Sequence, residues 1–293
     1  MYKKHVRRSL IYVPGIDSYK CEKALESNAD SIIFDLEDSV NPAMKPDARK
    51  SVSLLLKKVG ERSLKELLVR INTVSTLNGI EDLLAITQNP VDAIIIPKAC
   101  ANDIITADTL ISGIESSLNI QSKRIRLIAL IETTEAVNQI NEVIRSSDRL
   151  DGVHLGAEDL TKELSIARTR EGSEITYVRT GLLIAAKAHG IDFIDTPFTD
   201  YKDMEGLQID LTNIRQIGIQ AKAAIHPCQI NAINTAFTPT DEEIEQAWQI
   251  VEAFNAMQAQ NLGVTSFQGA MIDTPVAERA QNLIDRAKIY NVQ

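Results

Sequence analysis

Short runs of β-branched and aliphatic residues alternate along most of the chain with longer stretches whose apolar residues recur every three to four positions. The short runs lack polar alternation, which predicts strands covered on both faces, as in a parallel sheet. The longer stretches have the periodicity of amphipathic helices. We expect strands at residues 9–13, 31–34, 67–71, 93–96, 126–131, 152–155, 192–194 and 223–225. We expect helices at residues 19–27, 46–58, 79–88, 101–119, 135–146, 175–189 and 204–218.

Eight strand-then-helix units predict an α/β fold of the (β/α)8 TIM-barrel type. We assign residues 1–236 to this catalytic barrel and residues 237–293 to a C-terminal helical extension, because the pattern changes past Ala236. The barrel is complete without the extension. The extension must therefore pack along its own barrel or over a neighbouring subunit.

Two helices are expected in the extension. Thr240-Asp241-Glu242-Glu243 predicts a capping box that opens the first of them. A glycine-rich turn at residues 263–271 follows. Thr274 is then expected to cap the last helix, with Pro275 in its first turn.

Composition narrows the class of protein. The chain has 293 residues, with 40 acidic and 31 basic ones and a net charge of −9, so broad nucleic-acid binding is not expected. The first apolar run, residues 10–13, is too short for a signal-peptide core or a membrane span. Cys21, Cys100 and Cys228 form no Cys-x-x-Cys pair, which argues for a reducing compartment. We therefore expect a cytoplasmic protein.

Polar or charged residues follow nearly every predicted strand. In a barrel of this type the strands end at one face, where catalytic residues collect. A sheet selected for stability alone would need few such residues, so their concentration indicates an active site. They are Pro14-Gly15, Asp35, Glu37, Asp38, Arg70, Asn72, Lys98, Glu132, Glu158-Asp159, Asp195-Thr196 and His226.

Glu132 and Asp159 follow neighbouring predicted strands, the fifth and the sixth. Two carboxylates with no histidine between them form an oxygen-only site that suits Mg²⁺ better than zinc. A magnesium ion held in this way would leave coordination positions open for an α-keto or α-hydroxy acid. Alternatively, each acid caps the following helix or pairs with an arginine.

Arg70 ends a predicted buried strand, where an isolated charge is costly. Its planar fork suits bidentate binding of a substrate carboxylate, although a salt bridge to Asp35 or Glu37 would satisfy it equally well. Asp35, Glu37 and Asp38 are expected to orient Arg70 or a metal-bound water rather than to bind the metal. Lys98 could bind a phosphate, a carboxylate or one of these acids.

Seven segments resemble the citrate lyase β-subunit-like family, which includes malyl-CoA and citramalyl-CoA lyases. They occur in the same order over about residues 7–290, and seven collinear blocks are more specific than any one of them. The segments are RSLIYVPG at 8–15, FDLEDSV at 34–40, VRIN at 69–72, IPK at 96–98, IET at 131–133, GAEDL at 156–160 and GAMIDTPV at 269–276.

The resemblance implies a TIM barrel that uses Mg²⁺ to cleave or form a carbon–carbon bond in a 3-hydroxy-3-carboxyacyl thioester. By position, Glu132 and Asp159 resemble the metal ligands, and Arg70 resembles the clamp for the keto-acid carboxylate. Backbone amides from Ala157 through Glu158 to Asp159 would add hydrogen bonds to that acid.

The resemblance also implies a trimer or hexamer in which Asp273 acts as acid and base at a neighbouring subunit's barrel. Arg8 and Pro14 resemble positions that contact the thioester and CoA. The sequence departs from the family at Ala270, where lysine is common, and around Lys222, where a Gly-Lys pair is common. These departures leave open whether the acyl carrier is free CoA or an acyl carrier protein.

We therefore expect an Mg²⁺-dependent acyl-CoA lyase that cleaves, or forms, malyl-CoA or citramalyl-CoA, with acetyl-CoA and glyoxylate or pyruvate as the other side of the reaction. An alternative is the β subunit of citrate lyase, which would release oxaloacetate from a citryl carrier protein together with α and acyl-carrier subunits. Two further alternatives are a malate synthase-like relative that hydrolyses the thioester and a non-catalytic subunit.

Overall fold

The computed structural model describes residues 6–59, 63–259, 265–267 and 270–290. The chain divides into two compact units, Met1–Asn234 and Thr235–Gln293. Among the described residues, no helix is both long and apolar enough to cross a membrane.

The first unit is built on eight parallel strands in the order β7-β6-β5-β4-β3-β2-β1-β8. A bridge between Asp195, which follows β7, and Lys222 of β8 joins the two edges of the sheet and confirms the expected barrel. The strands are β1 (Ser9–Pro14), β2 (Ser31–Asp35), β3 (Glu66–Arg70), β4 (Ala93–Ile96), β5 (Arg126–Ile131), β6 (Leu150–Leu155), β7 (Asp192–Ile194) and β8 (Lys222–Ala224).

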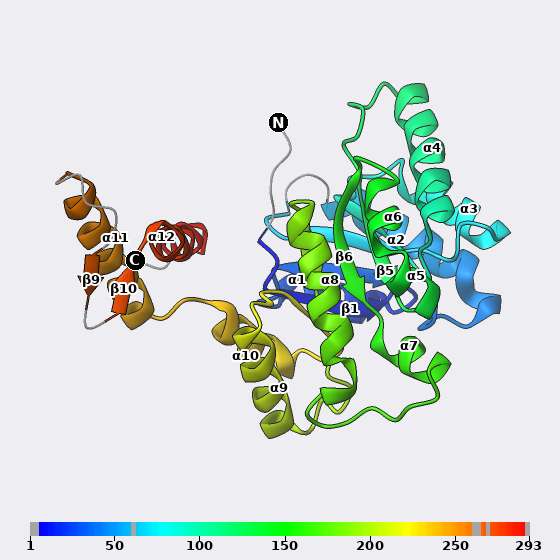
Figure 1. Cartoon of the computed structure of the whole chain (residues 1–293). Coiled ribbons are helices and arrows are strands. Elements are labelled where there is room, and N and C mark those ends of the chain that lie inside the picture. The colour runs from blue at the N-terminus through cyan, green and yellow to red at the C-terminus, as the bar shows by residue number, and fades with distance from the viewer. Residues whose placement is uncertain (1–5, 60–62, 260–264, 268–269, 291–293) are drawn as a thin grey trace. The chain divides into compact units, whose positions relative to one another are not determined.

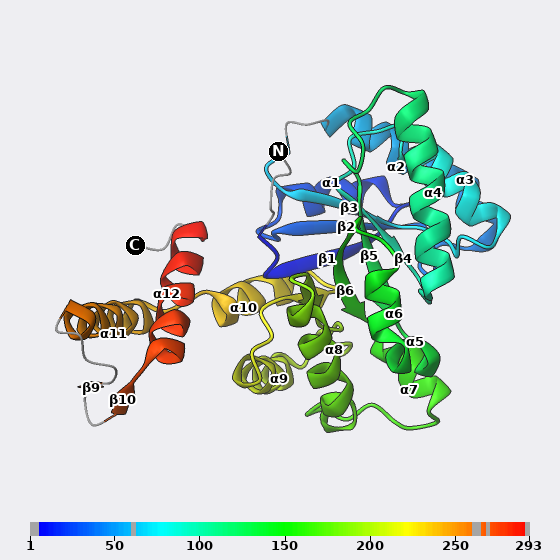
Figure 2. The same cartoon turned by 45° about the horizontal axis from the view of Figure 1, so that its top comes forward.

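Helices connect the strands and lie on the outside of them (Figures 1 and 2). They include the 3-10 helices η1 and η3, each of three residues. The helical elements are α1 (Ser18–Glu26), η1 (Pro42–Met44), α2 (Lys45–Val59), α3 (Leu77–Ile86), α4 (Ala101–Ser117), α5 (Thr134–Asn138), α6 (Ile140–Arg145), α7 (Ala157–Glu163), η3 (Ser173–Ile175), α8 (Thr176–Ala188), α9 (Met204–Gln216) and α10 (Cys228–Phe237).

Three helices differ from the sequence-based expectation. The helix expected at residues 135–146 is divided into α5 and α6 at Gln139, whose φ of −103° and ψ of 20° are not helical. Neither α7 nor α10 was predicted. The seven residues of α7 span only two turns, which is too short for a clear amphipathic period.

The barrel interior is a hydrophobic cluster to which most strands contribute. Strands such as β2 are buried along their whole length, in agreement with their continuous apolar sequence. Tyr12 packs on the cluster from its position near the carboxyl end of β1. The buried members are Leu10, Ile33, Leu68, Ala93, Ile95, Ile128, Leu130, Ile194 and Ala221.

A charged network occupies the amino end of the barrel. The Arg7 guanidinium donates hydrogen bonds to Glu66 of β3 at 2.9 Å, to Asp151 of β6 at 2.6 Å and to Asp192 of β7 at 2.9 Å. The Arg7 side chain therefore links three strands. This network fills the amino end of the barrel, so the carboxyl end is the face at which a site can form.

The second unit contains α11 (Asp241–Ala259), β9 (Thr265–Phe267), β10 (Ala270–Ile272) and α12 (Thr274–Ile289). The two helices pack through a small cluster that includes Ala247, Ala280 and Ile284. The antiparallel pair β9–β10 lies where a turn was expected, although Gly263 itself is outside the described residues.

The helix cap expected at Thr274 is formed by Asp273 instead. The Asp273 Oδ1 atom accepts a hydrogen bond from the backbone N–H of Val276 at 3.2 Å, and Pro275 lies in the first turn as expected. A carboxylate both caps the helix and complements its dipole, which explains why Asp273 takes this position from the neighbouring threonine.

Candidate active site

A cavity of about 400 Å³ opens at the carboxyl ends of the barrel strands. Its walls come from the ends of β1, β2, β3, β5 and β6 and from the segments that follow β6, β7 and β8. The lining residues are Tyr12, Asp35, Asp38, Ser39, Arg70, Leu130, Glu132, His154, Leu155, Gly156, Ala157, Glu158, Asp159, Thr196, Pro197 and Ile225.

Glu132 and Asp159 both line this cavity. Glu132 is only 4% exposed, and its Oε1 atom accepts a hydrogen bond from the backbone N–H of Lys98 at 2.8 Å. A Cβ atom on Gly156 would lie 2.6 Å from Oε2 of Glu132, so a glycine is needed beside this carboxylate. Asp159 stands in the first turn of α7 with a third of its side chain exposed.

The Lys98 side chain lies near two carboxylates. Its Nζ atom is 3.8 Å from Oε1 of Glu37 and 3.9 Å from Oδ2 of Asp159. Burial and the neighbouring acid Glu37 raise the pKa of Glu132 to about 7. Burial likewise raises the pKa of Glu37 to about 7. Lys98 and Arg70 therefore compensate the negative charge of these acids only in part.

The residues present fit a hard divalent cation. Among the described residues, no three His, Cys, Asp or Glu side chains converge on a ready-made metal cage. Mg²⁺ is usually held by only one or two carboxylates, with waters and substrate oxygens as its other ligands. Glu132 and Asp159 supply such a pair, and a cation there would stabilise the charged form of the buried acid.

Arg70 makes the salt bridge that the sequence left as an alternative. Its Nε and Nη2 atoms donate to the two oxygens of Asp35, both at 2.7 Å, and its Nη1 atom lies 3.1 Å from Oε2 of Glu37. Its guanidinium also lies 5.1 Å from the centre of the Tyr12 ring. Burial alone would raise the pKa of Asp35, but the bonds from Arg70 hold it below its usual value.

The guanidinium of Arg70 is thus rigidly oriented while it still lines the cavity. Asp35 accepts hydrogen bonds from two of the five N–H groups of Arg70. The Nη1 side of the guanidinium is left able to bind a second carboxylate. Asp38 lies on this side as well, 3.6 Å away.

A family model described as HpcH/HpaI aldolase/citrate lyase matches residues 8–227, which include every strand of the barrel. The chain belongs to the HpcH/HpaI aldolase/citrate lyase family. This membership confirms the resemblance found in the sequence.

Relatives in this family are named as lyases. The chain is 34% identical to the citrate lyase subunit beta of Haemophilus influenzae over 97% of both chains. It is 30% identical to the L-malyl-CoA/beta-methylmalyl-CoA lyase of Rhodobacter capsulatus over 98% of this chain and 96% of that one. The chain is therefore an enzyme of the lyase class.

A solved structure of the family gives the same fold with ligands. Protein CitE from Mycobacterium tuberculosis, in complex with magnesium, acetoacetate and coenzyme A, superposes with a TM-score of 0.77 at 27% identity. The match covers 97% of this chain and 98% of that one.

Two residues expected in the family site, Arg8 and Pro14, are not part of the cavity lining. Arg8 precedes β1, and its Nε and Nη2 atoms donate to Asp30 at 2.9 and 2.8 Å. It therefore lies at the amino end of its own barrel, opposite the cavity. Pro14 ends β1 but is not among the residues that line the cavity. Asp273 belongs to the second unit.

The segment at residues 157–159 has partners of its own. The backbone N–H of Ala157 donates to Oγ1 of Thr196 at 3.3 Å, and the Glu158 carboxylate accepts from Nε of Arg168 at 2.9 Å. The Ala157 amide that the family resemblance assigned to the keto acid is therefore already hydrogen-bonded within the chain.

Two cavity residues, Tyr12 and His154, were not predicted. Each lies between apolar neighbours in its strand, and their rings are 5.8 Å apart. Burial and the nearby charge of Arg70 lower the pKa of His154 to about 3. A histidine within the apolar run Val153-His154-Leu155 was the available signal.

Proposed function

We propose that this lyase cleaves a 3-hydroxy-3-carboxyacyl thioester into an acetyl thioester and a 2-keto acid, with Mg²⁺ as cofactor. The observation that carries the proposal is the cavity in which Glu132, Asp159 and Arg70 line one space at the carboxyl end of the barrel. The magnesium, acetoacetate and coenzyme A bound to the mycobacterial neighbour support the same reaction class.

Glu132 and Asp159 are the proposed metal ligands. When bound, Mg²⁺ would act as a Lewis acid on the hydroxyl and carboxylate oxygens of the substrate. Lys98 orients Glu132 through its backbone N–H and brings a positive charge near Asp159. Lys98 adopts a left-handed φ of 47° to do so, a conformation that is uncommon for residues other than glycine.

Arg70 is proposed to hold the carboxylate of the departing keto acid through its Nη1 side. The two bonds to Asp35 fix the guanidinium plane, so the substrate is oriented without much movement of the protein. Glu37 and Asp38 lie on the same side and would be displaced from, or share, this contact.

Asp273 is proposed as the acid that completes the reaction. Cleavage would pass the proton of the 3-hydroxyl to the Asp273 carboxylate and leave the electron pair of the broken bond on the acetyl carbon as an enolate. The protonated Asp273 would donate its proton to that carbon, and in the condensation direction its carboxylate would remove it. We propose that Asp273 comes from a neighbouring subunit of a homotrimer or hexamer.

Three candidate substrates differ only in the substituent on carbon 3. Malyl-CoA carries hydrogen, citramalyl-CoA carries methyl and a citryl thioester carries carboxymethyl, giving glyoxylate, pyruvate and oxaloacetate respectively. The greater identity to a citrate lyase subunit beta, 34% against 30% for the malyl-CoA lyase, favours the citryl thioester as a second candidate, with an acyl carrier protein and α subunit as partners.

The decisive experiment is keto-acid release by the purified, chelator-stripped protein from malyl-, citramalyl- and citryl-CoA, with and without Mg²⁺. Metal-dependent release from a free CoA thioester without other subunits is the expected result, and free CoA is measured in parallel to detect hydrolysis. A folded protein that binds Mg²⁺ yet releases no keto acid from CoA or carrier-protein thioesters would contradict the proposal.

A further inference from the structure

His154 forms part of the floor of the cavity. It lies on β6 with 1% of its surface exposed, and its ring is tilted by 57° against the ring of Tyr12. Leu130, the other cavity residue at this level, belongs with Tyr12 to the hydrophobic interior of the barrel. His154 is therefore the polar group set into an otherwise apolar and aromatic floor.

The Nδ1 atom of His154 has no hydrogen-bond partner among the described residues, although it is enclosed. Buried polar atoms are nearly always paired, because an unpaired one has lost its hydrogen bonds to water without replacement. The ring is neutral at ordinary pH because burial and the charge of Arg70 keep its pKa at about 3. A neutral imidazole offers one donor and one acceptor to a ligand.

The proposed function assigns three of the four groups on the reacting carbon. Its carboxylate lies at Arg70, its hydroxyl oxygen lies beside Glu132 and Asp159, and its acyl arm must lead out through the open side of the cavity to the carrier. The fourth group, the substituent, is then directed to the remaining wall. That wall includes the floor that contains His154, together with Thr196, Pro197 and Ile225.

We propose that His154 is the specificity-determining residue of this site and hydrogen-bonds an oxygen atom of the substituent on the reacting carbon. The site then prefers keto acids whose substituent ends in a hydroxyl or carboxylate over those with methyl or hydrogen. A substituent without oxygen would leave the enclosed nitrogen unpaired, which is the strongest way a site can reject an analogue. This inference rests on the proposed function, and it favours a citryl-type substrate over a citramalyl-type one.

The test measures keto-acid dissociation constants by calorimetry in the presence of Mg²⁺, so it does not depend on turnover. The probes are glyoxylate, pyruvate, hydroxypyruvate and oxaloacetate. In the unmodified protein, hydroxypyruvate and oxaloacetate are expected to bind at least about tenfold more tightly than pyruvate, the effect of one buried hydrogen bond. In His154→Leu this advantage should disappear while Mg²⁺ affinity is unchanged.

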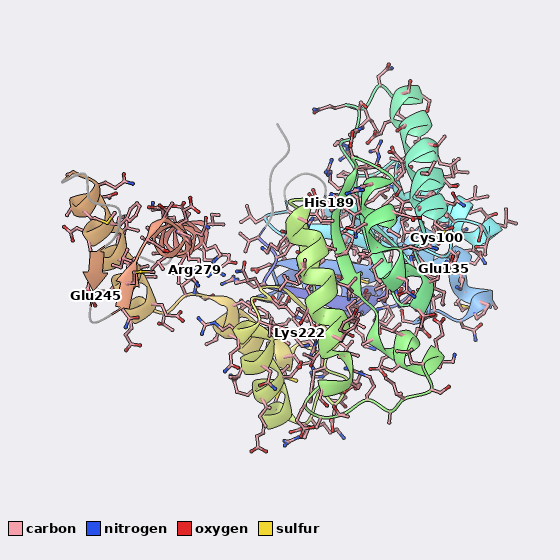
Figure 3. All side chains as sticks on the ribbon, viewed as in Figure 1. Cys100, Glu135, His189, Lys222, Glu245 and Arg279 are labelled. Carbon is pink, nitrogen blue, oxygen red and sulfur yellow. The ribbon has the colours of Figure 1, made fainter. Side chains whose placement is uncertain are left out.

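Two further variants separate the proposal from a structural effect. His154→Asn keeps a polar atom close to the position of Nδ1 and should retain part of the preference. His189→Leu makes the same chemical change at the end of α8, away from the cavity lining, and should retain all of it (Figure 3). If His154→Leu does not fold, the proposal is decided by whether the unmodified protein binds hydroxypyruvate and oxaloacetate more tightly than pyruvate and whether His154→Asn reduces that preference.

The failures can be distinguished. Equal or tighter binding of pyruvate by the unmodified protein, or an undiminished oxygen preference in folded His154→Leu, would overturn the role of His154 and leave the proposed reaction intact. Failure of every keto acid to bind in the presence of Mg²⁺ would overturn the proposed function and this inference together.

Discussion

The backbone N–H of Lys98 donates a 2.8 Å hydrogen bond to Oε1 of Glu132. The bond joins the segment after β4 to the residue that follows β5, and Lys98 adopts a left-handed φ of 47° at this point. The same lysine brings its Nζ atom to 3.9 Å from Asp159. The two proposed metal ligands are thus arranged around one residue of a third segment.

Glu132→Gln is expected to weaken Mg²⁺ binding by at least about tenfold, because even the outer partners of metal ligands typically change affinity by about 10–100-fold. The change removes a negative charge but keeps an oxygen for the Lys98 hydrogen bond, so folding should be retained. Calorimetric titration with Mg²⁺ measures the effect. Glu135→Gln is the matched control, since Glu135 is exposed on α5 (Figure 3). Unchanged Mg²⁺ affinity in Glu132→Gln would remove Glu132 from the ligand assignment.

Gly156→Ala is expected to abolish most activity and to destabilise the protein by about 1–3 kcal/mol, the usual range for overpacking. The new methyl group would lie 2.6 Å from both Cβ and Oε2 of Glu132 and would displace this carboxylate. Gly113→Ala is the control, because nothing lies within 4 Å of its added Cβ. In a helix interior it should stabilise by about 0.5–1 kcal/mol. Urea unfolding and steady-state kinetics on both variants provide the comparison.

Asp273→Asn separates proton transfer from helix capping. Asparagine can accept the hydrogen bond from Val276 N–H that Asp273 now accepts, so the melting temperature should change little. Turnover should fall by about 100-fold or more, in line with the 10²–10⁴-fold range of general acid–base catalysis. Near-normal turnover in this variant would exclude Asp273 as the acid.

The same variant tests whether Asp273 acts across subunits. Asp273→Asn and Glu132→Gln proteins, each inactive alone, are unfolded, mixed and refolded together. Mixed oligomers would contain some barrels with an intact Glu132 that receive an intact Asp273 from a neighbour, and activity should partly return. Activity that stays absent in verified mixed oligomers would show that both residues are needed in one chain.

Asp195 makes the stability of the barrel depend on pH. Burial alone would raise the pKa of Asp195, but Lys222 and Arg179 hold it at about 2. Because its folded pKa lies below its usual value of 3.8, the group stabilises the fold fully above about pH 4 and loses this contribution as pH falls toward 2.

Asp195→Asn should therefore destabilise the protein at pH 7 by about 3 kcal/mol, the lower end of the range for breaking a buried ion pair, because buried Lys222 and Arg179 lose one partner charge and keep Asp210 as the other. The difference between the variant and the unmodified protein should shrink between pH 4 and pH 2. Urea unfolding at pH 7, 4 and 3 measures it. A difference that stays constant over this range would contradict a charged Asp195 in the folded barrel.

The sequence alone predicted the eight strands and the face on which the site forms. Strand periodicity is a local property, and the residue after each strand is brought to the same end of any parallel barrel. Glu132, Asp159 and Arg70 were found in this way, each by its position in its own strand unit. The resemblance to the family added Asp273 and the reaction class, which no periodicity contains.

Tertiary structure decided what these side chains contact. The guanidinium of Arg70 binds both oxygens of Asp35, because β2 and β3 are paired in register at these two residues. His154 lies inside the barrel beside Tyr12, where its Nδ1 atom has no hydrogen-bond partner among the described residues. Asp273 rather than Thr274 caps α12. Pairing and burial depend on residues far apart in the chain, so no local pattern could specify them.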